Sequence, residues 1–194
     1  MGMAKAAPLI LLLVSTAMAI QLVLQSTVAE PKEVDEWLQN LQTSKQTVSR
    51  LHFYFHDTLS GKQPSAVQVA QAPNTDKSPT FFGGVFIFDD PLTEGPEPTS
   101  GLVGRAQGLY GSACQQELGL LVAMTVVFTT GKFNASSLTI LGRNAALQQV
   151  REMPIIGGTG VFRLARGFAI ANTHSVDFTS GDAIVEYNVV AIHY

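Results

Sequence analysis

Cysteine is almost missing from this sequence, because Cys114 is the only one among 194 residues. No internal disulfide can form, so packing must hold the fold together, with or without help from a partner subunit. A lone thiol of this kind is most often a small buried core residue. The sequence therefore predicts a core-stabilised domain rather than a disulfide scaffold.

Charged residues are scarce as well, at 14% of the chain, with a net charge of −3 and no basic block. The missing basic patch argues against nucleic acid as a partner. Hydrophobic residues make up 46% of the chain, which excludes an intrinsically disordered protein. The length is sufficient for one domain with a proper core.

Several enzyme signatures are also absent, including GxSxG, HExxH and CxxC. The glycines of 158–160 do not begin a nucleotide loop, because Arg163 stands where a third glycine is required. His52 and His56 would lie ~13 Å apart on a strand, too far to bind one metal. No metal site and no cofactor are predicted, so any chemistry would rest on positioning and proton transfer.

The first 29 residues have the features of a signal peptide. Lys5 precedes an apolar run, and cleavage sites are predicted after Ala19 and after Ala29. An uncleaved membrane anchor is the alternative, although polar residues interrupt the apolar stretch. We expect a secreted, extracellular protein with no membrane attachment after cleavage. Asn134 begins an Asn-Ala-Ser glycosylation site that such a protein could carry.

Beyond the signal, residues 30–50 predict a short amphipathic helix or an arm, and residues 51–194 predict one domain of strands. Seventeen glycines and nine prolines, placed between apolar runs, favour many short strands with turns. Eight strands are predicted, over 51–59, 66–72, 81–88, 101–110, 118–129, 136–142, 161–174 and 183–193. The fold class is therefore all-β, as an eight-stranded antiparallel β-barrel with a central ligand pocket. A β-sandwich is the alternative.

A carboxylate ends the aromatic row of the first predicted strand. Phe53, Phe55 and Asp57 share one face, an arrangement suited to a flat phenolic ligand. Poor solvation would raise the pKa of Asp57 and make it an acid or base near neutral pH. The alternative is that Asp57 ends the strand and caps the turn at 60–61. Asp89 and Asp90, followed by a proline, are predicted to form a turn.

An arginine stands among apolar residues in the seventh predicted strand. With period two, Phe162, Leu164, Arg166 and Phe168 share one face. A guanidinium on such a face needs a partner or a ligand, because an unpaired buried charge is costly. The two open interpretations are a ligand-binding arginine and one that is salt-bridged within the sheet.

Several ordered motifs together resemble the plant dirigent proteins. The motifs are residues 53–57, 82–84, 89–93, 104–110, 151–154, 158–160 and 165–167. The likeness runs from about Leu51 to Tyr194. It implies an eight-stranded barrel that forms a homo-oligomer, either a dimer or a trimer, in the apoplast.

The resemblance also implies a function. Dirigent proteins direct the coupling of two phenoxy radicals, typically from coniferyl alcohol, into one stereoisomer of a lignan. A separate laccase or peroxidase oxidises the phenolic substrate, so the expected protein is a stereo-directing auxiliary rather than an enzyme. A defence or binding protein without chemistry is a further alternative.

The family's site residues map onto this chain one by one. Asp57 matches the pocket aspartate and Arg166 matches the arginine that orients phenolic oxygens, so both are predicted as catalytic. Tyr110 matches a pocket tyrosine, and we expect Phe53, Phe55, Phe162 and Phe168 to contact the substrate as well. Barrel closure would have to bring Asp57 and Arg166 together.

One position departs from the lignan-forming pattern. Those members commonly carry an acidic residue where this chain has Val161. The chain therefore looks closer to the broader dirigent-like branch, which includes pterocarpan synthases. These dehydrate an isoflavanol through a quinone methide without an oxidase, so a hydro-lyase is the alternative to the coupling role.

Overall fold

The computed structural model describes residues 31–194, and the predicted signal segment lies outside the described residues. The chain divides into two units, Met1–Thr43 and Ser44–Tyr194. In the first, helix α2 covers Pro31–Leu41. Val34, Trp37 and Leu41 are its half-buried positions, at the spacing of one helix face. Within 31–194, no helix has the length and apolar character needed to cross a membrane.

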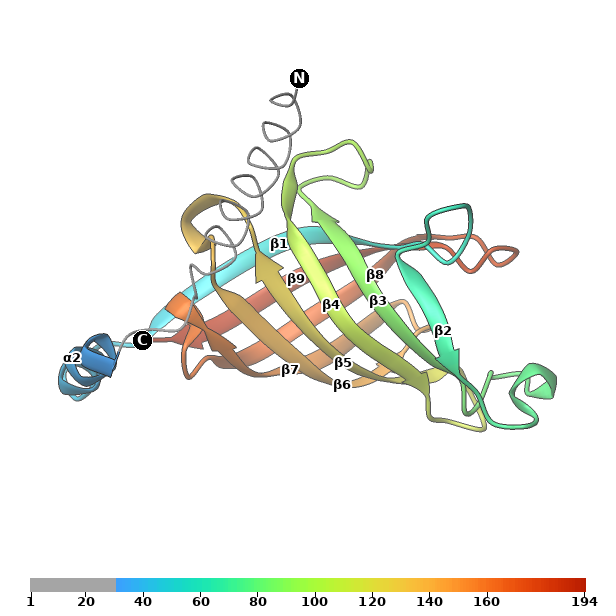
Figure 1. The fold of residues 1–194 in the computed structure, drawn as a ribbon, viewed down its shortest axis with the longest axis horizontal. Coiled ribbons are helices and arrows are strands. Elements are labelled where there is room, and N and C mark those ends of the chain that lie inside the picture. Colours follow the sequence, from blue (N-terminus) through green and yellow to red (C-terminus); the bar gives the residue numbers. More distant parts are fainter. Residues whose placement is uncertain (1–30) are drawn as a thin grey trace, which may run out of the picture. The chain divides into compact units, whose positions relative to one another are not determined.

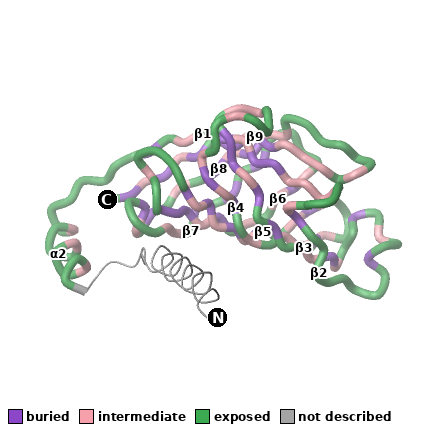
Figure 2. Tube along the Cα trace, turned by 45° about the horizontal axis from the view of Figure 1, so that its top comes forward, coloured by how far each residue is buried: buried purple, intermediate pink, exposed green. Residues whose placement is uncertain are grey.

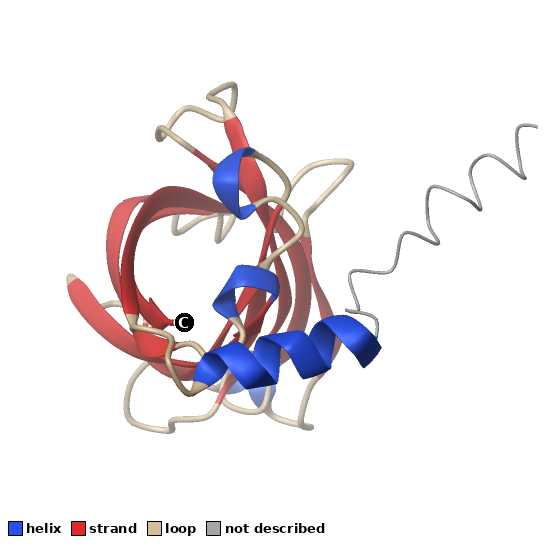
Figure 3. Ribbon diagram, turned by 90° about the vertical axis from the view of Figure 1, so that its left-hand side faces the viewer, coloured by secondary structure: helices blue, strands red, loops and turns tan. Residues whose placement is uncertain are grey.

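The second unit is a closed sheet of antiparallel strands (Figure 1). The strands are β1 Thr47–Asp57, β2 Ala66–Ala70, β3 Val85–Thr93, β4 Leu102–Ser112, β5 Gly119–Phe128, β6 Ser137–Ala145, β7 Val150–Thr159, β8 Arg166–Val176 and β9 Ala183–His193. They follow the order β1-β9-β8-β7-β6-β5-β4-β3-β2, and β1 also pairs with β3. This last pairing closes eight strands into a ring, which Figure 3 shows end-on. The predicted antiparallel eight-stranded barrel is therefore confirmed, and a sandwich is excluded.

The eight strands of the ring are not the eight predicted from the sequence. The predicted strand 66–72 is β2, which lies outside the ring and pairs with β3 beyond the part that β1 covers. The ring instead contains β7. The proline and glycines of this segment had led to the prediction of an irregular stretch rather than a strand. The pairing of β7 with β6 shifts at Ile156, because Thr139 faces Gly157 and Ile140 faces Ile155. Bulges of this kind are where strands tolerate proline and glycine.

Alternating residues of each strand face the barrel interior, and they form a continuous core. On β1, Phe53 and Phe55 are buried, and their partners Tyr187 and Val185 on β9 are buried too. Directly opposed residues of an antiparallel pair point to the same face of the sheet. Figure 2 shows the resulting pattern, with buried positions along the strands and exposed ones in the loops.

One end of the barrel is filled by aromatic side chains. The 3-10 helix η2, Gly131–Phe133, follows β5, and η3, Gly160–Phe162, follows β7. The rings of Phe133 and Phe162 lie 4.9 Å apart, and Phe128 and His193 pack on Phe162 at 5.6 and 5.1 Å. Since β5, β7 and β9 run in the same direction, these residues gather where all three strands end.

The predicted strand 161–174 is wrong in its first part. Its opening residues form η3 and a turn, and β8 begins only at Arg166. Gly160 has φ +61° and Leu164 has φ +57°, values that interrupt an extended strand. Phe162 and Leu164 therefore do not share a strand face with Arg166 and Phe168.

Candidate functional site

Asp57 ends β1 with its side chain on the interior side of the barrel. It shares the parity of Phe53 and Phe55, and its partner on β9 is Ala183. Its Oδ1 atom is buried and has no hydrogen-bond partner among the described residues. Burial raises the pKa of Asp57 to about 6, opposed by a hydrogen bond from the Tyr110 hydroxyl and helped by the charge of Asp182.

A second buried carboxylate, Asp90, lies on β3. Its exposed fraction is 0%, and neither carboxylate oxygen has a hydrogen-bond partner in the described chain. Phe55 pairs with Leu92, so the same antiparallel register continued by two residues places Asp57 opposite Asp90. Burial first, and then the negative charge of Asp57, raise the pKa of Asp90 to about 8. Asp57 and Asp90 thus form a coupled pair, called the carboxylate pair below, that holds about one proton near neutral pH.

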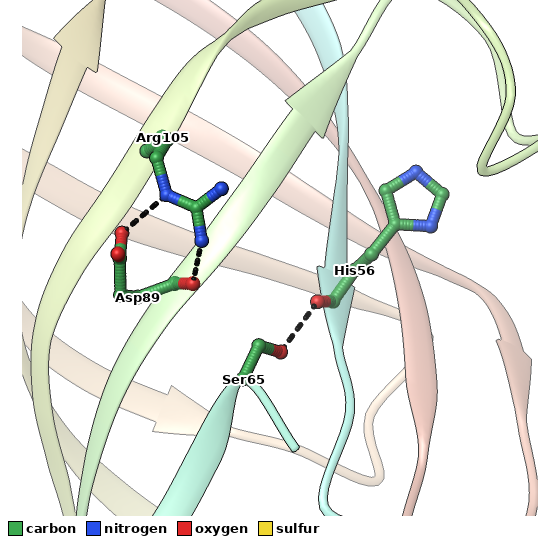
Figure 4. Close-up of polar contacts among 4 residues, drawn as sticks. All are labelled: His56, Ser65, Asp89 and Arg105. Carbon is green, nitrogen blue, oxygen red and sulfur yellow. Dashed lines mark hydrogen bonds and ion pairs between the residues drawn. The ribbon is translucent and has the colours of Figure 1, made fainter. Parts of the chain in front are cut away.

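The prediction that Asp89 and Asp90 form a turn is wrong, because both lie within β3. Asp89 points to the outer face, where its carboxylate accepts a hydrogen bond from Arg105 Nε at 2.6 Å (Figure 4). The other guanidinium contact of Arg105 is to the carbonyl oxygen of Asp89. The two neighbouring aspartates therefore have opposite environments, one salt-bridged in solvent and the other buried without a cation.

Pro91 is the reason why a turn was predicted here, since a proline usually ends a strand. The N–H of Asp89 donates to the carbonyl of Ser65, so position 91 faces the same edge of β3. That edge pairs with β2 as far as Phe88 and with β1 only from Leu92. Pro91 falls in the gap, where a missing N–H costs no ladder bond. The period-two run of Phe86, Phe88, Asp90 and Leu92 was the signal that could have located the buried carboxylate.

Tyr110 on β4 completes the group around the carboxylate pair. Its ring stacks on Phe86 at 5.1 Å and on Phe88 at 5.6 Å. Burial raises the pKa of Tyr110 well above its usual range, and the charges of Asp57 and Asp90 add to the effect. The phenol therefore stays neutral and can donate a hydrogen bond to Asp57.

An aromatic wall adjoins this group. Tyr187 stacks on Phe53 at 5.6 Å and packs against Phe55 at 5.9 Å. Phe55 in turn meets Phe88 edge-on at 5.7 Å. Flat apolar surfaces of this kind suit an aromatic ligand. The structure therefore brings four of the predicted site residues, Phe53, Phe55, Asp57 and Tyr110, to the same interior face.

Arg166 and Phe168 do not join them. Arg166 pairs with Ile192, and Ile192 pairs with Val48, an exposed residue. Opposed residues share a face, so Arg166 and Phe168 lie on the outside of the barrel. Val48 and Asp57 are also about 30 Å apart along β1 at the strand rise. The predicted convergence of Asp57 with Arg166 is wrong, and Phe162 lies in the aromatic end rather than beside Asp57.

Side chains fill the barrel interior at one end, whereas interior-facing residues are partly exposed to solvent at the other. Four interior-facing polar residues are partly exposed, namely Asp57, Tyr110, Asn144 and Thr173. A separate cavity of about 410 Å³ touches Asp57 and Ala183. Its lining also includes outward-facing residues such as His56 and Ile184, so it is a surface groove beside the seam of the barrel.

The remaining candidate residues carry little chemistry. In residues 31–194, no three His, Cys, Asp or Glu side chains lie close enough to hold a metal ion. His52 pairs with Glu186 at 2.8 Å, and His56 bonds to Thr93 at 2.6 Å. Asn134 is exposed after η2, which leaves its side chain accessible.

Replacing Asp90 with asparagine is expected to stabilise the protein at about pH 8 by up to about 5 kcal/mol and to change stability little at about pH 4. In the folded state the pKa of Asp90 is about 8, whereas in the unfolded chain it is 3.8. The wild-type protein therefore loses stability as the pH rises through this interval, and asparagine removes that loss. Urea denaturation at the two pH values measures the effect, and an equal gain at both would contradict it.

Comparison with known proteins agrees with the fold. The model of the dirigent-like protein family matches residues 48–192. Dirigent protein 23 of Arabidopsis thaliana is 51% identical over 181 residues, covering 93% of this chain and 97% of that protein. Pterocarpan synthase 1 of Glycyrrhiza echinata is 54% identical over 147 residues, covering 75% of this chain and 78% of that protein.

Solved structures give the same result. A pterocarpan synthase dirigent protein is 53% identical with a TM-score of 0.72, covering 76% of this chain and 96% of that one. A second one has a TM-score of 0.71 at the same 53% identity, covering 77% and 89%. The resemblance found in the sequence is thus confirmed, and the chain belongs to the dirigent-like protein family.

Proposed function

We propose that the protein binds a phenolic alcohol inside the barrel and eliminates water from it through a quinone methide, as a hydro-lyase acting on an isoflavanol. The observation that carries this proposal is the carboxylate pair, which is buried, coupled and without a cation partner. With pKa values of about 6 and about 8, Asp57 is mostly ionised and Asp90 mostly protonated near neutral pH. One group can accept a proton while the other donates one.

The reaction is written with every atom accounted for. Asp90 donates its proton to the leaving hydroxyl, the carbon–oxygen bond breaks, and water departs. Asp57 accepts the proton of the phenol whose electrons form the quinone methide. A second phenolic hydroxyl of the substrate then adds to the methide carbon and gives its proton to Asp90, while Asp57 returns its proton to the oxygen of the first phenol. The products are the cyclised molecule and water, with no net oxidation.

Two findings support the dehydration. Relatives named as pterocarpan synthases are 54% identical to this chain, and two solved pterocarpan synthase dirigent proteins are 53% identical. Val161 also stands where the lignan-forming pattern has an acidic residue, whereas Asp90 supplies a second carboxylate from another strand. The required acid and base are therefore both present in this chain.

The second candidate is stereoselective coupling of phenoxy radicals from a monolignol such as coniferyl alcohol. The stacked rings of Phe86, Tyr110 and Phe88, at 5.1 and 5.6 Å, favour it because they offer flat surfaces to planar substrates. A separate laccase or peroxidase would supply the oxidation. The barrel would then fix the faces on which two radicals meet, and the product would be an optically active lignan.

A chiral product assay separates the two candidates. We expect the purified barrel to convert a 2′-hydroxyisoflavanol to a single enantiomer of the cyclised product with no oxidant added. Coniferyl alcohol with laccase, in the presence and absence of the protein, forms the second arm. Enantiomeric excess only in the second arm would replace dehydration by coupling, and inactivity in both arms would favour a non-catalytic binding or defence protein.

We further propose that the mature protein works in the apoplast as a homo-oligomer. Leu121 and Leu141 are exposed apolar residues on the outer face of β5 and β6, which would be covered in such an assembly. Asn134 is exposed and could carry a glycan. Mass spectrometry of the secreted protein would give the cleavage site, the glycan mass and, under native conditions, the subunit number.

A further inference from the structure

The surface groove beside the seam of the barrel has no part in the proposed reaction. Its volume is about 410 Å³, and its lining includes Pro91 of β3, His56 of β1, Ile184 of β9 and Ser175 of β8. His56 pairs with Ile184, and Ile184 pairs with Ser175. Opposed residues share a face, and the side chain of the adjacent Asp57 points inward, so this row lies on the outside of the barrel.

His56 is the buried polar side chain of this row, with an exposed fraction of 5%. Its Nε2 atom lies 2.6 Å from Thr93 Oγ1, and the Thr93 hydroxyl donates to the carbonyl of Gly95 at 2.7 Å. A hydroxyl has one proton to donate, so Thr93 accepts its other hydrogen bond from Nε2–H of His56. The neutral imidazole therefore carries its lone pair on Nδ1.

The Nδ1 atom of His56 is available to a ligand. No hydrogen bond to it is formed within the described part of the chain, and it is not sealed from solvent as Nδ1 of His193 is. In Figure 4 the ring points away from Ser65, the neighbour that contacts the His56 carbonyl. Burial lowers the pKa of His56, which keeps the ring neutral and Nδ1 an acceptor.

The rest of the groove is apolar or negatively charged. Pro98, from the loop 94–101, and Val176, at the end of β8, add apolar surface. Asp177 and Asp182 belong to the turn between β8 and β9, and hydrogen bonds from neighbouring turn residues lower the pKa of both carboxylates. Among the described residues that line the groove there is no lysine and no arginine. The groove therefore repels anions.

We propose that this groove is a second ligand site, called the seam site below, which binds an uncharged phenol on the outside of the barrel. The phenol donates its hydroxyl proton to Nδ1 of His56, and its ring lies over Pro91 and Ile184. The volume is within the range of small-molecule sites, about 300–1,000 Å³. The seam site does not depend on the proposed dehydration, because it concerns binding outside the barrel.

The lining of the groove selects this class of ligand. One fixed acceptor among apolar surfaces satisfies one donor, so a sugar would leave most of its hydroxyl groups unpaired at a cost in free energy. A carboxylate or phosphate would meet Asp177 and Asp182 without a cation to pair with. An ammonium group would lose its water against the apolar floor. A flat ring with one hydroxyl group meets none of these penalties.

The probe is 4-ethylphenol, and the readout is the ¹⁵N resonance of His56 Nδ1. This resonance moves when Nδ1 accepts a hydrogen bond, and His56→Gln identifies it by removing it. We expect the shift to saturate with a Kd of about 1 mM, a usual strength for so small a ligand. 4-Ethylanisole has the same ring without a donor and should cause no comparable shift.

Charge selectivity is tested with the anion 4-hydroxyphenylacetate. It should bind about fivefold more weakly than 4-ethylphenol at low ionic strength, because Asp177 and Asp182 repel it. The difference should shrink as salt is added, since salt screens exposed charges. Phenethylamine, a cation without a phenol, should shift the His56 resonance less than 4-ethylphenol does.

Ile184→Trp fills the groove from its floor and should weaken binding of 4-ethylphenol by about tenfold or more. Val190→Trp is the matched control, because Val190 is also a partly buried, outward-facing residue of β9. It pairs with Arg50 and Phe168 and does not line the groove. The control should keep the Kd within about twofold. Near-UV circular dichroism checks that both variants are folded.

The wild-type protein alone can overturn the proposal, so the test does not depend on either variant. An unmoved His56 resonance, or an equal shift with 4-ethylanisole, would exclude the hydrogen bond to Nδ1. Tighter binding of 4-hydroxyphenylacetate or of phenethylamine would exclude an uncharged ligand. A response that Ile184→Trp leaves unchanged would place the phenol inside the barrel and remove the seam site.

Discussion

Replacing Asp90 with asparagine is expected to lower kcat/KM for isoflavanol dehydration by about 10²- to 10⁴-fold, the usual contribution of general acid catalysis. Asparagine keeps the shape of the buried side chain but cannot deliver a proton to the leaving hydroxyl. KM should change little, since the loss falls on the transition state. Steady-state kinetics on the purified protein measures both constants.

Asp89→Asn is the matched control, since Asp89 is the adjacent carboxylate of the same strand and points outward to Arg105. We expect it to keep kcat/KM within about twofold, as is usual for surface substitutions. Equal losses in the two variants would show that β3 is merely disturbed. Full activity of Asp90→Asn would remove the acid role altogether.

The pH dependence gives an independent check of the same pair. Activity should rise through about pH 6 as Asp57 ionises and fall through about pH 8 as Asp90 loses its proton. Because the two groups are coupled, these limits belong to the pair rather than to each residue. Asp57→Asn should remove the acidic limb of the bell-shaped profile.

The barrel could be predicted from the sequence because its signal is repeated in many segments. Alternating apolar residues, such as those of β1, recur between turn residues, and the ordered family motifs pointed to the same architecture. The set of strands that close into the ring was harder to predict. Val150–Thr159 contains the turn-forming residues Pro154, Gly157 and Gly158, and only its pairing with β6 and β8 identifies it as β7.

Only some of the site residues could be predicted from the sequence, and the reason again lies in the strands that carry them. Phe53, Phe55 and Asp57 share one unbroken strand, so their parity alone places them on one face. Whether the Arg166 side chain faces into or out of the barrel depends on where β8 begins. The positive φ of Leu164 interrupts the alternation of inward and outward side chains just before Arg166. Asp90 was missed because Pro91 appeared to end the strand, and only the gap between β1 and β2 explains why the strand continues.

Phe162→Ala is expected to lower the free energy of unfolding by about 3–5 kcal/mol, the usual cost of removing a buried phenyl ring. Phe162 is 0% exposed, and its ring contacts Phe133 at 4.9 Å, His193 at 5.1 Å and Phe128 at 5.6 Å. Three strands end around this ring, so collapse into the vacated space would have to move all of them. Denaturant unfolding with an unchanged m-value measures the loss.

Phe178→Ala is the control for this change, because Phe178 is 79% exposed and its removal should cost less than about 0.5 kcal/mol. A loss below about 1 kcal/mol for Phe162→Ala would contradict the packing role. KM decides between that role and the substrate contact predicted from the sequence. His193, which packs on Phe162, pairs with Thr47 at the far end of β1 from Asp57. The folded variant should therefore keep KM within about twofold, since its ring lies remote from the carboxylate pair.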